Sequence, residues 1–191
     1  MSLGESFPGV LAAARGGEEG AWRAIYEEFA PQVRGYLRGR GEAEPDDLLG
    51  EVFLQVVRDL PNFEGAEADL RAWVLTIAHH RLIDERRGQA RRPSESAAPV
   101  ASEDGRPGGN AEEEALEALE EERMRKLLAG LPSDQRSVLL LRVIGDLTVE
   151  KVAQLLGKTP GAVKQLQRRG LATLEKRVSR FRVASEGYGR S

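Results

Sequence analysis

The side chains best suited to binding chemistry lie in one short stretch near the carboxy terminus. Lys164, Gln165, Arg168 and Arg169 recur at helical spacing and project from one side of a helix. Lysine and arginine bind phosphate oxygens, and arginine and glutamine also bind the major-groove edges of guanine and adenine. Apolar residues occupy the opposite side of the same stretch. The pattern predicts a helix that packs by its apolar side and presents cations to a nucleic acid.

A second set of residues has side chains that bind metals. His79 and His80 are adjacent, so on a helix they project about 100° apart and do not easily share an ion. His80 and Asp84 stand at i and i+4 and could share one, but two ligands fall short of the three of a catalytic zinc site. The chain also has no cysteine, which excludes disulfides and thiolate sites. The sequence predicts no catalytic residue, no metal site and no cofactor.

Charge is unevenly distributed along the chain. The formal net charge is −3, yet between residues 151 and 182 there are nine bases and a single acid, Glu175. Acids gather in 42–69 and 103–122 instead. Because phosphate binding is electrostatic, one cationic helix on an acidic chain predicts a weak binder that needs a second point of attachment.

Hydropathy gives no indication of a membrane segment. No apolar run approaches the roughly 20 residues of a spanning helix. The first 20 residues lack the basic start and apolar core of a secretory signal. We expect a cytoplasmic protein without membrane insertion.

Apolar periodicity predicts helices throughout. In the first half, apolar residues recur at helical spacing in 22–37, 48–60 and 70–82, which predicts a domain of three or four helices over residues 1–92. Pro31 is expected to kink or divide the first of these helices, because it lacks a backbone donor and clashes with the preceding turn.

The second half is separated by a change in composition. Residues 93–112 are rich in Pro, Gly, Ser and acids, which predicts a disordered linker. Helical spacing resumes over 113–182, and 183–191 are expected to form a flexible tail. The predicted fold is therefore all-α, with two small helical domains joined by a flexible acidic linker.

Capping residues delimit the helices of the second domain. Ser133 and Thr148 are expected N-caps, and Gly157 is the expected stop of the helix that begins after Thr148. Thr159 is expected to cap the next helix, with Pro160 at its first position. A short helix, a tight turn with glycine and a longer helix predict a helix-turn-helix.

Two segments resemble parts of bacterial sigma factors. Residues 45–92, beginning PDDLLGEVFLQVV, resemble their region that binds core polymerase and melts promoters. Residues 127–174 are similar to their promoter-binding domain. The order of the halves, with no further domain, resembles the extracytoplasmic-function branch. The resemblance implies a non-catalytic factor that binds core RNA polymerase and directs promoter-specific transcription initiation.

The resemblance also implies roles for particular residues. The helix expected to grip the polymerase clamp helices contributes Asp46, Asp47, Leu48, Glu51, Val52, Phe53 and Gln55. Residues expected at the single-stranded minus-ten element are Phe63, His79, His80, Arg81, Arg86 and Arg87. Residues expected at the minus-thirty-five element are Thr159, Lys164, Gln165, Arg168 and Arg169. Expected partners are the clamp helices and flap of core polymerase, promoter DNA and an anti-sigma factor.

Three departures from the family pattern limit these roles. Gly50 replaces the usual glutamine of the clamp-binding helix, and His79-His80 replace a common Arg-Asn pair. In the reading helix, 165–167 is Gln-Leu-Gln where many members carry Ser-Arg-Leu. An alternative function is a stand-alone helix-turn-helix regulator with a helical sensor domain, which should bind duplex DNA unaided.

Overall fold

The computed structural model describes residues 3–91 and 111–187. Within these ranges the chain forms helices joined by short turns, with no strand. The predicted all-α class is confirmed. Residues 3–91 are called the amino-terminal domain below, and residues 111–187 the carboxy-terminal domain.

Helices α1 to α4 and two short 3-10 helices build the amino-terminal domain. The elements are η1 (Gly4–Ser6), α1 (Phe7–Arg15), α2 (Glu19–Arg40), α3 (Pro45–Asp59), η2 (Leu60–Asn62) and α4 (Glu67–Arg91). Helix α2 contacts α1, α3 and α4 and is the centre of this domain. Sequence analysis had not identified α1, although Phe7, Leu11 and Ala14 have helical spacing and are buried.

Helix α2 continues without interruption across Pro31. The prediction that this residue divides the helix is wrong. Pro31 is exposed, while Ala30 and Val33 beside it are buried in the core. Burial along the whole helix therefore offsets the cost of the lost backbone bond, which is about 3 kcal/mol.

Four helices form the carboxy-terminal domain: α5 (Ala111–Ala129), α6 (Ser133–Val143), α7 (Val149–Leu156) and α8 (Pro160–Gly187). The helix-turn-helix of α7 and α8 is present. Helix α5 begins inside the predicted linker 93–112, most of which lies outside the described residues. Helix α8 continues into the predicted tail 183–191 as far as Gly187, and no glycine or proline lies between Gly170 and that end.

The caps of the helix-turn-helix are largely as predicted. Thr148 accepts a hydrogen bond from the backbone of Lys151, and Gly157 ends α7 with a left-handed φ of 62°. The cap predicted at Ser133 is wrong, because Pro132 occupies the N-cap position and Ser133 is already helical. The Ser133 hydroxyl instead accepts a hydrogen bond from Arg40 of the other domain.

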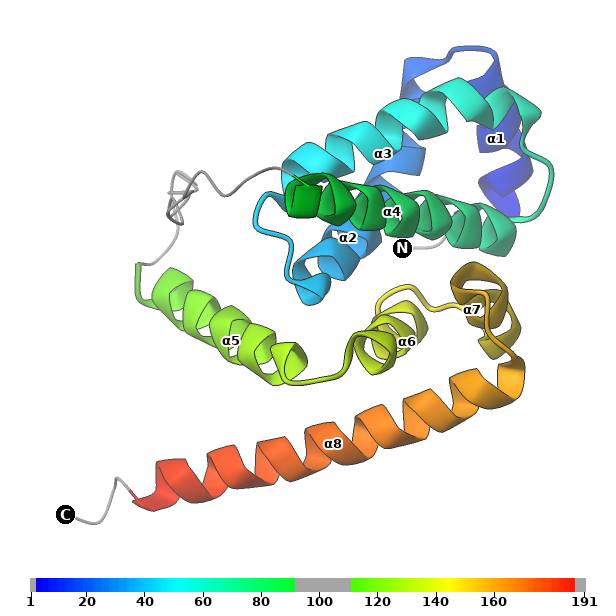
Figure 1. The fold of residues 1–191 in the computed structure, drawn as a ribbon. Coiled ribbons are helices and arrows are strands. Elements are labelled where there is room, and N and C mark those ends of the chain that lie inside the picture. The colour runs from blue at the N-terminus through cyan, green and yellow to red at the C-terminus, as the bar shows by residue number, and fades with distance from the viewer. Residues whose placement is uncertain (1–2, 92–110, 188–191) are drawn as a thin grey trace.

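The two domains pack directly against each other. Figure 1 shows α6 and α7 beside α2 and α4, with α8 on the far side of the carboxy-terminal domain. Helix α2 contacts α5 and α6, and α4 contacts α7. Buried side chains of both domains consequently form one continuous core.

Candidate nucleic-acid interface and docking surface

The cationic face of α8 is exposed as predicted. Lys164, Gln165, Arg168 and Arg169 all face solvent, while Val163 on the opposite side is buried. Among the side chains that the structure describes, no ion pair involves these three cations. Their charge is therefore available to a ligand, and phosphates and base edges suit it.

Thr159 positions this helix by capping it. Its hydroxyl Oγ1 accepts a hydrogen bond from the backbone N–H of Ala162 at 3.2 Å. A threonine cap orients the first turn of the helix and satisfies one of its free donors. The cap predicted from sequence is confirmed.

Helix α3 presents acids on its outer face. Asp46, Asp47 and Glu51 are exposed, and Asp46 accepts a hydrogen bond from Arg34 at 2.6 Å. Leu48 and Val52 are buried in the core, so their side chains offer no surface to a partner. The contact role predicted for these two residues is corrected: they anchor the helix instead.

An exposed apolar groove lies beside these acids and was missed from sequence. Leu54 is 70% exposed, Val57 50% and Tyr26 43%, and the Tyr26 ring packs on Phe53 with centroids 4.7 Å apart. With Gly50 and neighbouring residues of α2 they line a hollow of about 540 Å³. The sequence feature that could have revealed the groove was Leu54, an apolar residue that lies outside the buried stripe of α3.

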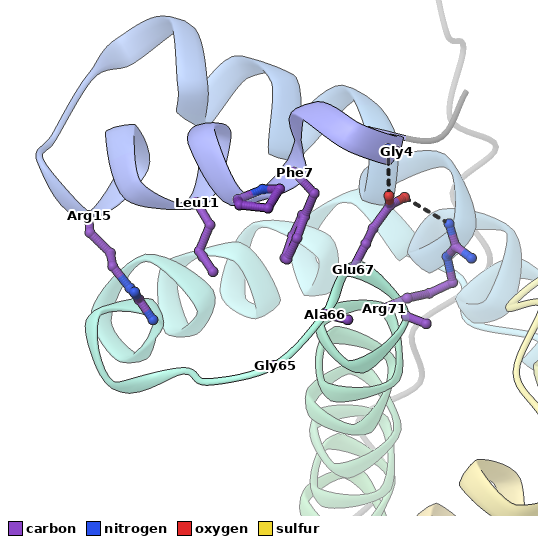
Figure 2. A pocket seen from close by; sticks show the side chains of 10 residues that line it. Gly4, Phe7, Leu11, Arg15, Gly65, Ala66, Glu67 and Arg71 are labelled. Carbon is purple, nitrogen blue, oxygen red and sulfur yellow. Dashed lines mark hydrogen bonds and ion pairs between the residues drawn. The ribbon is translucent and has the colours of Figure 1, made fainter.

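The loop between α3 and α4 folds over a cavity of about 590 Å³ beneath α1. Figure 2 shows Phe7 and Leu11 of α1 above Gly65 and Ala66 of the loop, with Arg15 at one end. The Arg15 guanidinium donates a hydrogen bond to the carbonyl oxygen of Phe63. Helix α1 thus holds the loop in place.

Phe63 does not offer the stacking plane predicted for it. Its side chain is only 9% exposed, and its ring packs on Trp73 with centroids 5.4 Å apart. The loop turns this ring inward because burial of an aromatic side chain is strongly favourable. Trp73 is itself partly buried against the core.

Glu67 joins three segments at the rim of this cavity. It accepts a hydrogen bond from the backbone of Leu3 at 3.2 Å. It also accepts hydrogen bonds from the backbone of Gly4 at 2.8 Å and from Arg71 at 3.2 Å, both drawn in Figure 2. Arg71 also pairs with Glu28 of α2 at 3.3 Å. These buried or half-buried charges fix the start of α4 relative to α1 and α2.

The two histidines of α4 have different environments. His79 Nδ1 lies 2.6 Å from the Tyr36 hydroxyl, and its ring is half-buried. The contact with DNA predicted for His79 stays a prediction. Burial, with the positive charge of Arg40, lowers the pKa of His79 to about 4, and burial raises the pKa of Tyr36 to about 12. His80 is exposed.

Arg81, Arg86 and Arg87 of α4 also differ in their contacts. Arg81 Nε donates to Oε1 of Gln55 at 3.1 Å, and its Nη1 lies 3.7 Å from Glu51. Arg86 Nη2 donates to the carbonyl oxygen of Arg40, the last residue of α2, at 2.6 Å. Arg87 is exposed and pairs with Asp84 at 3.4 Å.

Metal ligands do not gather anywhere in the described ranges. No group of three or more histidine, aspartate or glutamate side chains is suited to an ion there, and Asp84 pairs with Arg87. None of the described helices has the length and apolarity to span a membrane.

Comparison with known proteins decides the family. Residues 25–92 match the family described as Sigma-70 region 2, and residues 121–174 match Sigma-70, region 4. The ECF RNA polymerase sigma factor ShbA of Streptomyces griseus is 38% identical over 168 residues, covering 82% of this chain and 88% of ShbA. This chain belongs to the extracytoplasmic-function (ECF) sigma factors.

Further comparisons agree with this membership. The ECF sigma factor SigD of Mycobacterium tuberculosis is 34% identical over 184 residues, covering 92% of this ECF sigma factor and 85% of SigD. A structure of CnrH in complex with the cytosolic domain of CnrY has a TM-score of 0.64 at 20% identity, over 89% of this chain and 95% of CnrH, which shows a common fold. Membership favours the role in transcription initiation over the stand-alone regulator.

Proposed function

We propose that the groove and acids of α3 are the surface by which this sigma factor docks on core RNA polymerase. Leu54 and Val57 provide exposed apolar area, Glu19 and Arg23 of α2 add charge to the lining, and Asp47 and Glu51 are exposed acids of the same helix α3. An apolar groove with a charged rim suits an amphipathic helix that carries basic residues. Gly50, where relatives commonly carry glutamine, leaves this groove open.

Helix α8 would read the upstream, minus-thirty-five element as duplex DNA. Its exposed cations and Gln165 supply phosphate contacts and base contacts, and Thr159 sets the angle of its first turn. Few phosphates can be neutralised by one such helix, so its affinity without polymerase is expected to be low.

The amino-terminal domain would hold the separated strand at the minus-ten element. The cavity beneath α1 has a volume in the range of small-ligand pockets, and Arg15 and Arg71 lie on its border. A base turned out of the stack could enter it. His80 and Arg87, further along α4, are exposed and would add contacts to the strand.

The remaining features of the proposal follow from the family. The factor itself would carry out no reaction, since polymerase supplies the chemistry, and it would act in the cytoplasm. An anti-sigma factor is the expected regulator, and it would compete for the same α3 groove or the α8 face.

One observation carries the proposal: an apolar docking groove and an unpaired cationic helix lie on different domains of one chain. Gel filtration of the full chain with core polymerase tests it directly. We expect the chain to elute with polymerase and to leave duplex promoter DNA unbound when polymerase is absent. Tight duplex binding at physiological salt without polymerase, together with no co-elution, would contradict the proposal.

A further inference from the structure

The loop between α3 and α4 is shaped locally by hydrogen bonds at its two ends. Residues 63–66 follow η2, and the backbone N–H of Phe63 donates to the carbonyl oxygen of Leu60 at 3.0 Å. The backbone N–H of Ala66 donates to Oδ2 of Asp69 at 2.9 Å. Each bond joins residues three apart in the sequence. Both therefore shape the ends of the loop but do not fix its place on the domain.

Gly65 gives this loop a backbone conformation that other residues would resist. Its φ is 150°, which residues with a side chain rarely adopt. A Cβ atom at this position would lie 2.8 Å from Cβ of Asp69 and 3.1 Å from Cζ of Phe63. Glycine also has more backbone freedom to lose than any other residue when the chain becomes ordered. Contacts from outside the loop therefore matter for holding it in one conformation.

Helix α1 supplies such a contact through Arg15. The guanidinium Nη2 donates to the carbonyl oxygen of Phe63, 48 residues further along the chain. Arg15 lies in the last turn of α1, where Leu11 and Ala14 are buried and anchor the helix on the domain. Arg15 itself is exposed, and Figure 2 shows it extending from α1 at one end of the cavity. A surface side chain on an anchored helix thus holds the backbone of the loop.

The start of the same amino-terminal segment bonds to the other end of the loop. Glu67, directly after the loop, accepts hydrogen bonds from the backbone N–H groups of Leu3 at 3.2 Å and Gly4 at 2.8 Å. The segment 3–15 therefore contacts the loop at both ends, and the cavity of about 590 Å³ lies between them. This segment precedes residue 25, where the match to Sigma-70 region 2 begins.

We propose that Arg15 is a positioning residue that fixes the loop at the cavity, so that the cavity can receive a base of the separated minus-ten strand. This inference rests on the proposed function. Arg15 acts through the carbonyl oxygen of Phe63 and does not itself bind the base or a phosphate. A loop that is already ordered binds at a lower entropic cost. Loss of the Arg15 bond should therefore weaken capture of the base while the domain stays folded.

Hydrogen exchange in the free factor tests whether Arg15 fixes the loop. Arg15→Ala removes the bond, and the matched control is Arg58→Ala, an exposed arginine of α3 that pairs with its neighbour Asp59 at 3.9 Å. Because both side chains are exposed, neither substitution should unfold the domain. The amides of Phe63 and Ala66 should exchange at least about tenfold faster in Arg15→Ala than in Arg58→Ala. Equal exchange in the two variants would overturn the proposal.

Binding of single-stranded DNA tests the consequence for function. The probe is the non-template minus-ten strand of a fragment that the complete polymerase complex transcribes, with an abasic site placed at each position in turn. With the unaltered factor, an abasic site at the captured position should lower affinity at least about fivefold, since stacking of one base contributes that much. With Arg15→Ala the same abasic site should lower affinity less than about twofold. A loss as large as that of the unaltered factor would overturn the proposal.

The salt dependence of this binding distinguishes positioning of the loop from direct contact with DNA. If Arg15 acts through the loop, the slope of log K against log salt should be equal for Arg15→Ala and the unaltered factor. A slope smaller by about 0.7 in Arg15→Ala would show that Arg15 contacts a phosphate and would overturn the proposal. If the unaltered complex transcribes no fragment, or no abasic site changes its affinity, the proposed function fails. Hydrogen exchange still decides whether Arg15 positions the loop.

Discussion

Arg81 Nε donates a hydrogen bond to Oε1 of Gln55 at 3.1 Å, and this bond joins two surfaces that sequence analysis had kept apart. Gln55 was predicted to bind polymerase, and Arg81 to bind the separated DNA strand. Their contact places the proposed docking surface on α3 beside α4. Substitutions in one surface therefore need controls for effects on the other.

Reversal of charge on α3 should abolish docking. Asp47→Lys with Glu51→Lys replaces two exposed acids of α3, and we expect affinity for core polymerase to fall at least about tenfold, or about 1.4 kcal/mol. Fluorescence anisotropy of the labelled factor measures this. The control, Glu5→Lys with Glu64→Lys, makes the same change of net charge on exposed residues elsewhere. Equal weakening by both pairs would mean that overall charge alone is responsible.

The groove should contribute to binding but not to folding. Leu54→Ala removes a side chain that is 70% exposed, so we expect the free energy of unfolding to change by less than about 0.5 kcal/mol while polymerase affinity falls. Val52→Ala, two residues earlier and fully buried, should instead cost about 2 kcal/mol of stability. Chemical denaturation and anisotropy distinguish the two. Unchanged affinity of Leu54→Ala would remove the groove from the docking surface.

The cationic face of α8 should control upstream binding and its dependence on salt. Arg168→Ala with Arg169→Ala should weaken binding of the complete polymerase complex to promoter duplex, and reduce the slope of log K against log salt by about 2. Association of the factor with core polymerase should not change. Arg180→Ala, an exposed arginine further along the same helix, is the control. If the double variant has the same slope of log K against log salt as the unaltered factor, these arginines do not contact phosphate.

His79 should make stability dependent on pH. Its pKa is about 4 in the folded protein against an ordinary value of 6.5, because burial disfavours the imidazolium. The unfolded chain therefore binds more protons between these values, and stability should decline by up to about 3 kcal/mol as pH falls from 6.5 toward 4. His79→Gln removes this titration and should show a shallower decline in denaturation curves. If the free energy of unfolding falls equally with pH in both proteins, His79 is not the group responsible.

Interactions between residues close in sequence explain why much of this fold could be predicted from the sequence. Thr148, Gly157 and Thr159 act on the backbone within a few residues, so their roles follow from residue type alone. The exposed cations of α8 follow equally from helical periodicity.

Long-range packing explains what sequence analysis missed. The partners of Arg40 lie more than 90 residues away, and the inward turn of Phe63 depends on Trp73 and α1. Ser133 was read as a cap because it precedes a helix, but its hydroxyl contacts the other domain. Such pairings depend on the tertiary arrangement and have no local signature.

Run-off transcription by core RNA polymerase on a library of promoter fragments, with and without the full chain, tests the central claim most directly. The account predicts that defined transcripts appear only when the chain is present, and that they start from fragments with shared upstream and start-proximal elements. An identical transcript pattern in both reactions, from a chain that is folded and present in excess, would contradict it.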